Sequence, residues 1–254
     1  MIIVECDQGN LVWHQARAGL ITASMFETIQ KKVNGLTDQQ RKYVDALLAG
    51  KTELAAKAIA GYKSQPKMTD KVATALEGKP VGEYSDATKD YAFRLAVERI
   101  SGEPLDEGFQ TWAMKRGNEL EPDARACHEI MINTLVTKAG FIMTDDEVFG
   151  ASADGIIGDD GGSEYKCLID PSRLRTILIE KDIDQFKAQV QGCLWITGRK
   201  WWHFGLYCPA LKSIGKEFTL VEVKRDENYI EELELNLIAF NTYVEDYKLK
   251  IINS

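Results

Sequence analysis

The stretch from Gly150 to Lys166 reads GASADGIIGDDGGSEYK, and it decides the class of fold and points to the chemistry. Two strand-like runs flank a turn rich in Asp and Gly, which is the pattern of a β-hairpin. Glu164 and Lys166 are two residues apart on the second run, so the period of a strand places both on one face. Asp154 ends the first run, where its carboxylate can lie beside Glu164 across the hairpin.

These residues suit hydrolysis of a phosphodiester. Two neighbouring carboxylates bind Mg²⁺ well, because this hard cation prefers oxygen ligands, and the backbone carbonyl of Tyr165 is a natural third ligand. A lysine beside the cation can lower the pKa of a bound water or stabilise charge on the phosphate. The alternative is a surface hairpin with an incidental Glu-x-Lys pair, since this spacing alone is common.

Two helices supply further candidates. On a helix expected over residues 110–132, Glu121 shares a stripe with small and apolar side chains, and an inward carboxylate needs a cation or hydrogen bonds. We therefore expect Glu121 to be a further metal ligand, the alternative being a partly exposed glutamate. On a helix expected over residues 183–197, Gln189 lies next to the apolar stripe and could orient water or a phosphate oxygen, although spacing alone favours simple solvation.

The rest of the chain predicts an α/β protein. Apolar runs after residue 134 predict strands near residues 141–143, 148–157, 163–168, 201–208 and 217–223. The C-terminal helix carries apolar residues at alternating spacings of three and four, which favours core packing over a partner surface. The sequence therefore predicts a mixed, twisted sheet of about five strands flanked by helices.

Residues 31–82 stand apart as a helical unit inserted into a core made of residues 1–30 and 83–254. Thr37 and Thr52 are expected to cap two helices joined at Gly50, a helix-turn-helix arrangement, and a third helix is expected over residues 67–76. The total charge is −8, but residues 31–80 hold ten basic and five acidic side chains. This segment therefore carries +5 and the remainder −13. Its basic face could be solvated or could contact DNA.

Several short motifs, in one order, give the chain a family resemblance. They are WHQARAGLITAS at 13–24, KRGNELEPDA at 115–124, SADG at 152–155, EYKC at 164–167 and QVQ at 189–191 with WIT at 195–197. In this order they resemble the lambda exonuclease and YqaJ-type viral recombinase family, which has a restriction-endonuclease-like core. The resemblance covers roughly residues 10–30 and 83–230. The insert, with AAKAIAGY at 55–62, resembles the N-terminal unit of phage small terminase subunits.

The resemblance implies a role for each matched residue. Asp154 and Glu164 become the central metal ligands with Glu121 in support, Lys166 becomes catalytic, and Gln189 lies beside the nucleophile. Four further residues match a pocket for the 5′-phosphate at a DNA end: Arg17, Ser24, Ser152 and, across an alignment gap, Arg173.

The family also implies the wider setting. It implies Mg²⁺, with Mn²⁺ as a substitute, and 5′→3′ digestion of one strand of linear duplex DNA. It implies a trimeric ring around DNA and a single-strand annealing protein as partner, in the cytoplasm of a bacterial host. Two departures stand out: Ala153 replaces the family's proline before the metal-binding Asp, and Leu168 replaces the proline after Lys-Cys. The insert leaves ring assembly and the choice between exonuclease and endonuclease open.

Other classes of site are not predicted. The five cysteines are scattered, so neither an iron–sulfur cluster nor a disulfide framework is expected. There is no G-x-x-x-x-G-K-[ST] motif for ATP, no apolar run of the ~20 residues that span a membrane, and no secretory signal at Met1. The expected function is a Mg²⁺-dependent DNA exonuclease. The alternatives are an endonuclease on the same core or a DNA-binding packaging adaptor without activity.

Overall fold

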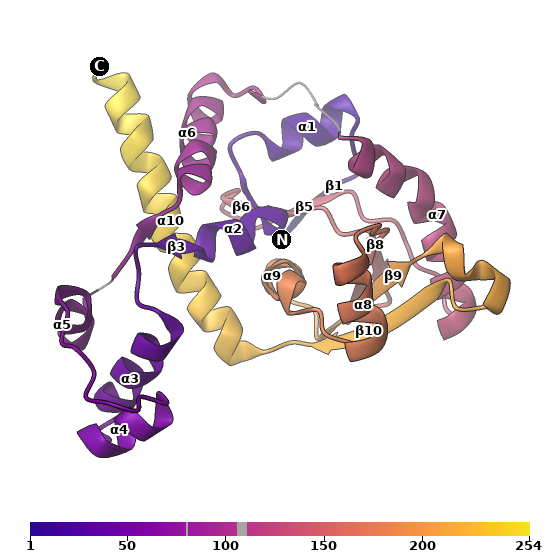
Figure 1. Ribbon diagram of the computed structural model, residues 1–254. Helices are drawn as coiled ribbons and strands as arrows, with labels where there is room; N and C mark the ends of the chain where they lie inside the picture. Colours follow the sequence, from indigo (N-terminus) through magenta and orange to yellow (C-terminus); the bar gives the residue numbers. More distant parts are fainter. Residues whose placement is uncertain (80, 106–110) are drawn as a thin grey trace. The chain divides into compact units, whose positions relative to one another are not determined.

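The computed structural model describes residues 1–79, 81–105 and 111–254, which form two compact units. The larger unit comprises residues 1–30 and 90–254, and the smaller unit comprises residues 31–89. Figure 1 shows the elements of both. Those of the larger unit run β1 (Ile2–Val4), α1 (Leu11–Arg17), β2 (Ile21–Thr22), η1 (Ala23–Met25), α2 (Phe26–Gln30), α6 (Asp86–Ser101, from Asp90 on), α7 (Trp112–Ile132), β5 (Phe141–Met143), β6 (Phe149–Ala151), β7 (Gly155–Ile157), β8 (Gly161–Lys166), α8 (Pro171–Glu180), η2 (Asp184–Phe186), α9 (Lys187–Thr197), β9 (Trp201–Tyr207), η3 (Pro209–Ile214), β10 (Phe218–Lys224) and α10 (Glu227–Ile252).

Two mixed sheets form the centre of the larger unit. In the first, the strand order is β1-β5-β6-β2, with β2 parallel to β6 and the other pairs antiparallel. In the second, the order is β10-β9-β8-β7, with β8 parallel to β9 and the other pairs antiparallel. The predicted α/β class is confirmed. The two sheets together have eight strands rather than about five. Strands β1, β2 and β7 have only two or three residues, which is too few to show the alternating pattern of a strand.

Helix α9 joins the two sheets. It packs against β5 and β6 of the first sheet and β9 of the second, and also against α2 and α10. Seven of its eleven residues are buried, so it is a central helix of the core and carries Gln189 inside the unit. Helix α10 buries Ile230, Leu233, Leu237, Phe240 and Val244, which confirms that its apolar stripe is a core face.

The glycines of the predicted turn have a different role from the one expected. Gly161 and Gly162 lie within strand β8 rather than in the turn. A Cβ atom at Gly161 would come within 2.2 Å of the Trp201 ring, and one at Gly162 within 2.2 Å of the Trp202 ring. The two glycines therefore let the two large indoles of β9 pack directly on β8. From the sequence alone, the same glycines look like turn residues.

The sequence predicts the long helices but misses α1 and α8. Helices α7 and α9 match the expected ranges closely, although the first turn before α9 is the 3₁₀ segment η2. The expected start of α7 at Gln110 lies outside the described residues. Helix α8 was not predicted; it begins after Asp170, whose side chain accepts a hydrogen bond from Arg173 N. No described helix is long and apolar enough to span a membrane.

The smaller unit has its own elements and core. It contains β3 (Lys32–Val33), α3 (Asp38–Leu48), α4 (Glu53–Ile59), α5 (Asp70–Leu76) and β4 (Glu83–Tyr84), with β3 antiparallel to β4. Thr37 and Gln40 form a reciprocal capping box on α3, and Thr52 caps α4. Helices α3 and α4 share a small core of Tyr43, Ala46, Ala56 and Ala60.

Candidate nuclease site

A cleft of about 480 Å³ in the larger unit gathers the residues predicted for the site. They come from α1, η1, α7, the connection between β6 and β7, β8, α8 and α9, so seven separate stretches of chain meet there. The predicted residues that line the cleft are Arg17, Ser24, Glu121, Ser152, Asp154, Glu164, Tyr165, Lys166, Arg173 and Gln189.

Asp154 lies just before β7 and is fixed by the backbone of the neighbouring strand. Its Oδ2 accepts a hydrogen bond from Tyr165 N at 2.6 Å, and its Oδ1 accepts one from Gln8 Nε2 at 3.2 Å. Burial raises the pKa of Asp154 well above its usual range, and the carboxylates of Glu164 and Glu121 raise it further. A carboxylate in such surroundings becomes favourable when a cation is close.

Glu164 and Lys166 lie on one face of β8, as the strand period predicts. Lys166 Nζ donates to Glu164 Oε1 at 2.6 Å, and Gln189 Nε2 donates to the same oxygen at 2.7 Å. Burial alone would lower the pKa of Lys166, but the carboxylates of Glu164 and Asp154 raise it above its usual value. Lys166 therefore carries a positive charge inside the cleft.

One oxygen of this group lacks a partner. Glu164 is only 4% exposed, and its Oε2 is buried and makes no hydrogen bond to any described residue. A buried charged oxygen without a partner is costly, so such an atom in a native structure marks a missing cation or water. Asp154 and Glu164 therefore fit a hard divalent cation, with oxygen donors on both sides.

Glu121 is held differently from the expectation. Its carboxylate forms an ion pair with Arg125 one turn along α7, and burial raises its pKa although Arg125 opposes this. Across the described residues, no three His, Cys, Asp or Glu side chains are grouped closely enough to hold a metal. The structure thus places Glu121 in the cleft, with its carboxylate paired to Arg125.

The residues predicted for a 5′-phosphate occupy another part of the same cleft. Arg17 Nη1 and Trp13 Nε1 both donate to Ser152 Oγ, at 3.1 and 2.9 Å, and the guanidinium stacks 4.0 Å from the Trp13 ring centroid. Arg17 has no ion pair within the described chain, and burial lowers its pKa. A half-buried guanidinium whose hydrogen bond within the described chain goes to a hydroxyl is suited to an anion.

Ser24 and Arg173 complete this region less tightly. The Ser24 hydroxyl lies 3.3 Å from Thr22 Oγ1. Arg173 is exposed on α8, where its Nε donates to Gln185 Oε1 at 2.6 Å. The structure therefore joins Arg17 and Ser152 directly, whereas Ser24 and Arg173 only line the same cleft.

Comparison with known proteins identifies the family. The YqaJ-like viral recombinase domain matches residues 12–200 of the chain. The chain belongs to this family. The sequence-based assignment to the lambda exonuclease and YqaJ family is thereby confirmed.

Solved structures agree with this YqaJ-like domain. An alkaline exonuclease from Laribacter hongkongensis, LHK-Exo, is 25% identical with a TM-score of 0.66, and each chain is covered to 95%. The same enzyme in complex with dAMP is 25% identical with a TM-score of 0.64 and 94% coverage of each chain. A phage-related exonuclease from Haemophilus somnus 129PT is 15% identical with a TM-score of 0.53, covers 89% of this chain and 99% of its own, and supports the fold alone. No curated protein sequence matches significantly.

The sequence analysis missed several residues that line or support the YqaJ-like cleft. Gln8 donates to Asp154 from a position 146 residues earlier, and Arg125 Nη2 donates to the Asp154 carbonyl at 2.9 Å. Behind β8, the buried His128 bonds the Tyr165 hydroxyl at 2.8 Å and His203 at 2.9 Å. Gln8, Arg125 and His203 have no local sequence signal, because their roles depend on contacts between distant segments. His128 alone had a weak signal, since it lies on the inward-facing stripe of α7.

Proposed function

We propose that this protein is a Mg²⁺-dependent exonuclease that digests one strand of linear double-stranded DNA in the 5′→3′ direction. Its product would be a single-stranded tail for phage-type homologous recombination. The coarser statement already holds: the chain is a nuclease of the phage recombination type, as predicted, given its family and its likeness to the alkaline exonuclease. The metal, the direction and the substrate end are the proposal.

One observation carries the proposal. The buried carboxylate of Glu164, with one oxygen unpaired, lies in hydrogen-bond contact with Lys166 and Gln189. Asp154 and the phosphate-binding candidates Arg17 and Ser152 line the same cleft. A cation site, a charged lysine and an anion pocket in one cleft are the parts that phosphodiester hydrolysis at a DNA end requires.

Each residue has a task in this proposal. Asp154 and Glu164, with the Tyr165 carbonyl, would hold Mg²⁺ or Mn²⁺, and Glu121 would support them. A cation held there would supply Lewis-acid activation of water and would neutralise charge on the phosphate. Lys166 Nζ stabilises negative charge on the scissile phosphate, and the Gln189 amide orients the attacking water.

The end of the DNA would be held by the other part of the cleft. Arg17, Ser24 and Ser152 would bind the 5′-phosphate through a guanidinium and two hydroxyls, with Arg173 at the rim. A charge-assisted bond from a buried arginine is stronger than a neutral one. This would place the first phosphodiester of the strand beside Lys166 and make a phosphorylated 5′ end the preferred substrate.

The wider setting follows from the resemblance to the lambda exonuclease family. We infer a trimeric ring around DNA, a single-strand annealing protein as partner and a place in the cytoplasm of a bacterial host. Residues 1–30 and 83–254 would be the nuclease core, and residues 31–82 an inserted unit with a helix-turn-helix. No ATP or iron–sulfur cluster is needed for this chemistry.

The decisive experiment uses purified protein, Mg²⁺, a set of linear duplexes and a closed circle. Linear duplexes carry 5′-phosphate, 5′-hydroxyl or a label at either end, and a covalently closed circle reports internal cutting. The expected result is release of 5′ nucleotides, faster from phosphorylated ends, with the circle intact. Omission of the metal with EDTA, and the Lys166→Ala variant, should both abolish cutting.

The other outcomes decide between functions. Cutting of the closed circle would make the protein an endonuclease on the same core. Release of 3′ nucleotides would reverse the direction. Binding without cutting, in Mg²⁺ and in Mn²⁺, would leave a DNA-binding packaging adaptor and contradict the proposal.

A further inference from the structure

The phosphate-binding candidates depend on a short stretch of backbone. Arg17 is the last residue of α1 and Ser24 lies in η1. The six residues between them have only one strand pair of their own, β2 on β6. Where this segment lies therefore determines where the guanidinium of Arg17 and the hydroxyl of Ser24 point within the cleft.

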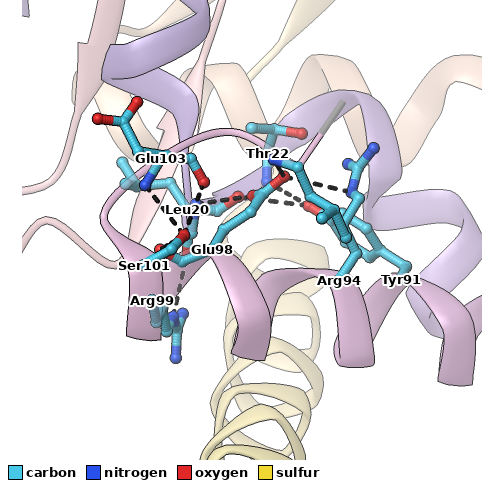
Figure 2. Close-up of polar contacts among 10 residues, drawn as sticks. Leu20, Thr22, Tyr91, Arg94, Glu98, Arg99, Ser101 and Glu103 are labelled. Atoms are coloured by element: carbon cyan, nitrogen blue, oxygen red, sulfur yellow. Dashed lines mark hydrogen bonds and ion pairs between the residues drawn. The ribbon is translucent and has the colours of Figure 1, made fainter. Parts of the chain in front are cut away.

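Three side chains of α6 hold that segment by its backbone (Figure 2). Glu98 Oε2 accepts a hydrogen bond from Gly19 N at 2.8 Å, and Arg99 Nε donates to Gly19 O at 2.8 Å. The Tyr91 hydroxyl accepts from Thr22 N at 3.1 Å and donates to Leu20 O at 3.4 Å. We call Tyr91, Glu98 and Arg99 the α6 clamp; it satisfies four polar groups of the segment.

The clamp is itself rigidly held. Glu98 is 5% exposed, and its other oxygen accepts from Leu105 N at 3.2 Å, with Arg94 Nε 3.7 Å away. Arg99 Nη1 donates to Asn241 Oδ1 at 2.7 Å and to Glu245 Oε1 at 2.8 Å, both on α10. A buried carboxylate is expensive unless it is fully bonded, so this network fixes the clamp in one arrangement.

The segment fits the clamp closely. Gly19 has a φ of +73°, and a Cβ there would come within 2.8 Å of Arg99 Cγ. Any other residue would be strained and would push against the clamp. The backbone of the segment therefore approaches α6 as near as a glycine allows.

One member of the clamp, Glu98, also lines a cavity together with the phosphate-binding candidates. This second cavity, of about 300 Å³, is lined by Arg17, Ser24, Arg94 and Glu98 among others. It shares Trp13, Arg17 and Ser24 with the cleft. The charges of Glu98 and Arg94 act on Arg17 across this cavity, with opposite effects on its pKa.

We propose that Glu98, acting with Tyr91 and Arg99, is a positioning residue that sets selectivity for 5′-phosphorylated DNA ends. It fixes the backbone from Gly19 to Thr22 and thereby aims Arg17 and Ser24 at the terminal phosphate. This inference rests on the proposed function, since it assigns a task to that same site. A purely structural role would weaken the fold and reduce the use of both kinds of end equally.

The test compares the two kinds of DNA end in two measurements. Binding of a short labelled duplex, with a 5′-phosphate or a 5′-hydroxyl, is followed by fluorescence anisotropy in EDTA. Initial cutting rates on the same duplexes are measured in Mg²⁺. For each protein the quantity of interest is the ratio of phosphate to hydroxyl, in affinity and in rate.

Two variants probe the clamp. Tyr91→Phe removes only the hydroxyl and keeps the ring that stacks on Phe240, so it should fold. Glu98→Ala removes the carboxylate. Hydrogen bonds to a charged group are stronger than those to a neutral hydroxyl. We therefore expect about a tenfold fall in the ratio for Glu98→Ala and about a threefold fall for Tyr91→Phe. Affinity and rate on 5′-hydroxyl ends should stay within about twofold of the wild type.

Arg17→Ala and Glu129→Ala complete the set. Arg17→Ala removes the guanidinium itself, so its ratio of phosphate to hydroxyl should be near one, the lowest value expected. Glu129 is a half-buried carboxylate on α7 that accepts from Val136 N at 2.8 Å, so Glu129→Ala breaks a comparable bond away from the segment. Its ratio should equal that of the wild type even if its melting temperature falls.

The outcomes distinguish failure of the clamp inference from failure of the proposed nuclease function. Folded clamp variants with the wild-type ratio, or equal losses on both kinds of end, would overturn the inference. A wild-type ratio near one in binding and in cutting would also overturn it, together with the phosphate pocket. If the wild type cuts no DNA at all, the nuclease proposal fails, and the binding ratios still decide the role of Glu98. If Glu98→Ala does not fold, Tyr91→Phe decides alone.

Discussion

The two units of this protein use charge in opposite ways. In the smaller unit, nearly all charged side chains are exposed, and seven basic ones have no ion pair within the described chain: Arg41, Lys42, Lys51, Lys57, Lys63, Lys67 and Lys71. In the larger unit, Asp154, Glu164 and Lys166 line a cleft. Each makes a hydrogen bond there: Asp154 with Tyr165 N, and Glu164 with Lys166. Solvated charges act at long range and weakly, whereas buried charges act at fixed points and strongly. We therefore expect the chemistry to occur in the larger unit, and the smaller unit at most to attract DNA.

The largest expected effect is on the lysine of the cleft. Lys166→Ala removes the lysine that is bonded to Glu164, so charge on the phosphate would lose a direct partner. Removal of a single such donor typically lowers the cutting rate by about 10²–10³-fold. We expect a loss of at least this size in initial rates on linear duplex in Mg²⁺.

The matched control is a lysine of the smaller unit. Lys57→Ala changes the same residue type on α4, where it is half-buried without an ion pair. Its cutting rate should stay within about twofold of the wild type. Equal losses of cutting rate in the two variants would mean that a lysine of the smaller unit matters as much as Lys166, which would contradict the contrast between the units.

The next effect concerns the cation and is measured by melting temperature. In EDTA, Asp154→Asn should melt at the wild-type temperature or above it, because it removes a charge that burial and Glu164 make unfavourable. In Mg²⁺ at about 100 times its dissociation constant, the wild type should gain about 2.7 kcal/mol, or roughly 5–10 °C. Asp154→Asn should lose most of that gain.

Asp160→Asn is the comparison for this prediction. Asp160 lies outside the cleft and pairs with Lys200 on the surface. This variant should keep the full rise in melting temperature with Mg²⁺. A wild-type protein that melts at the same temperature with and without the metal would remove the basis for a cation at Asp154.

Sequence alone could predict the features that depend on residues close together in the chain. The period of two on β8 was enough to place Glu164 and Lys166 on one face, because adjacent residues on a strand obey a fixed geometry. The capping of α3 by Thr37 was predictable for the same reason, since a cap and its helix are contiguous. Family membership was predictable from several motifs in one order.

The remainder depends on contacts across the sequence. Gly161 and Gly162 look like turn residues until Trp201 and Trp202 are seen to pack on them from a strand forty residues away. Gln8 and Arg125 reach Asp154 from separate segments, 146 and 29 residues away along the chain. Long-range pairs of this kind leave no periodic trace, so the partners of the site were the least predictable part of it.

A smaller effect is expected from the basic side chains of the smaller unit. We expect their neutralisation to weaken binding of duplex DNA about tenfold at low salt, while the cutting rate at saturating DNA stays unchanged. The slope of log affinity against log salt should fall by about 0.9 for each phosphate contact that is lost. The substitutions to glutamine are at Lys51, Lys63, Lys67 and Lys71, all exposed.

A second quadruple variant controls for total charge. It replaces four exposed lysines of the larger unit that lie outside the cleft, namely Lys181, Lys212, Lys216 and Lys250. If both variants weaken binding equally, net charge alone is responsible. If neither changes the slope, the basic face of the smaller unit is merely solvated.

The smallest effect tests whether the two units are energetically separate. Thr37→Ala removes the capping box of α3 and should destabilise that helix by about 1 kcal/mol, while Thr37→Ser keeps the hydroxyl and should not. Hydrogen exchange should then quicken for the amides of α3 and α4, which share a core, and not for β8 or α9. Because the cleft lies wholly within the larger unit, cutting should be unaffected at temperatures where α3 frays. Faster exchange in β8 as well would mean that the two units open together, and the cleft could then not be treated as independent of the insert.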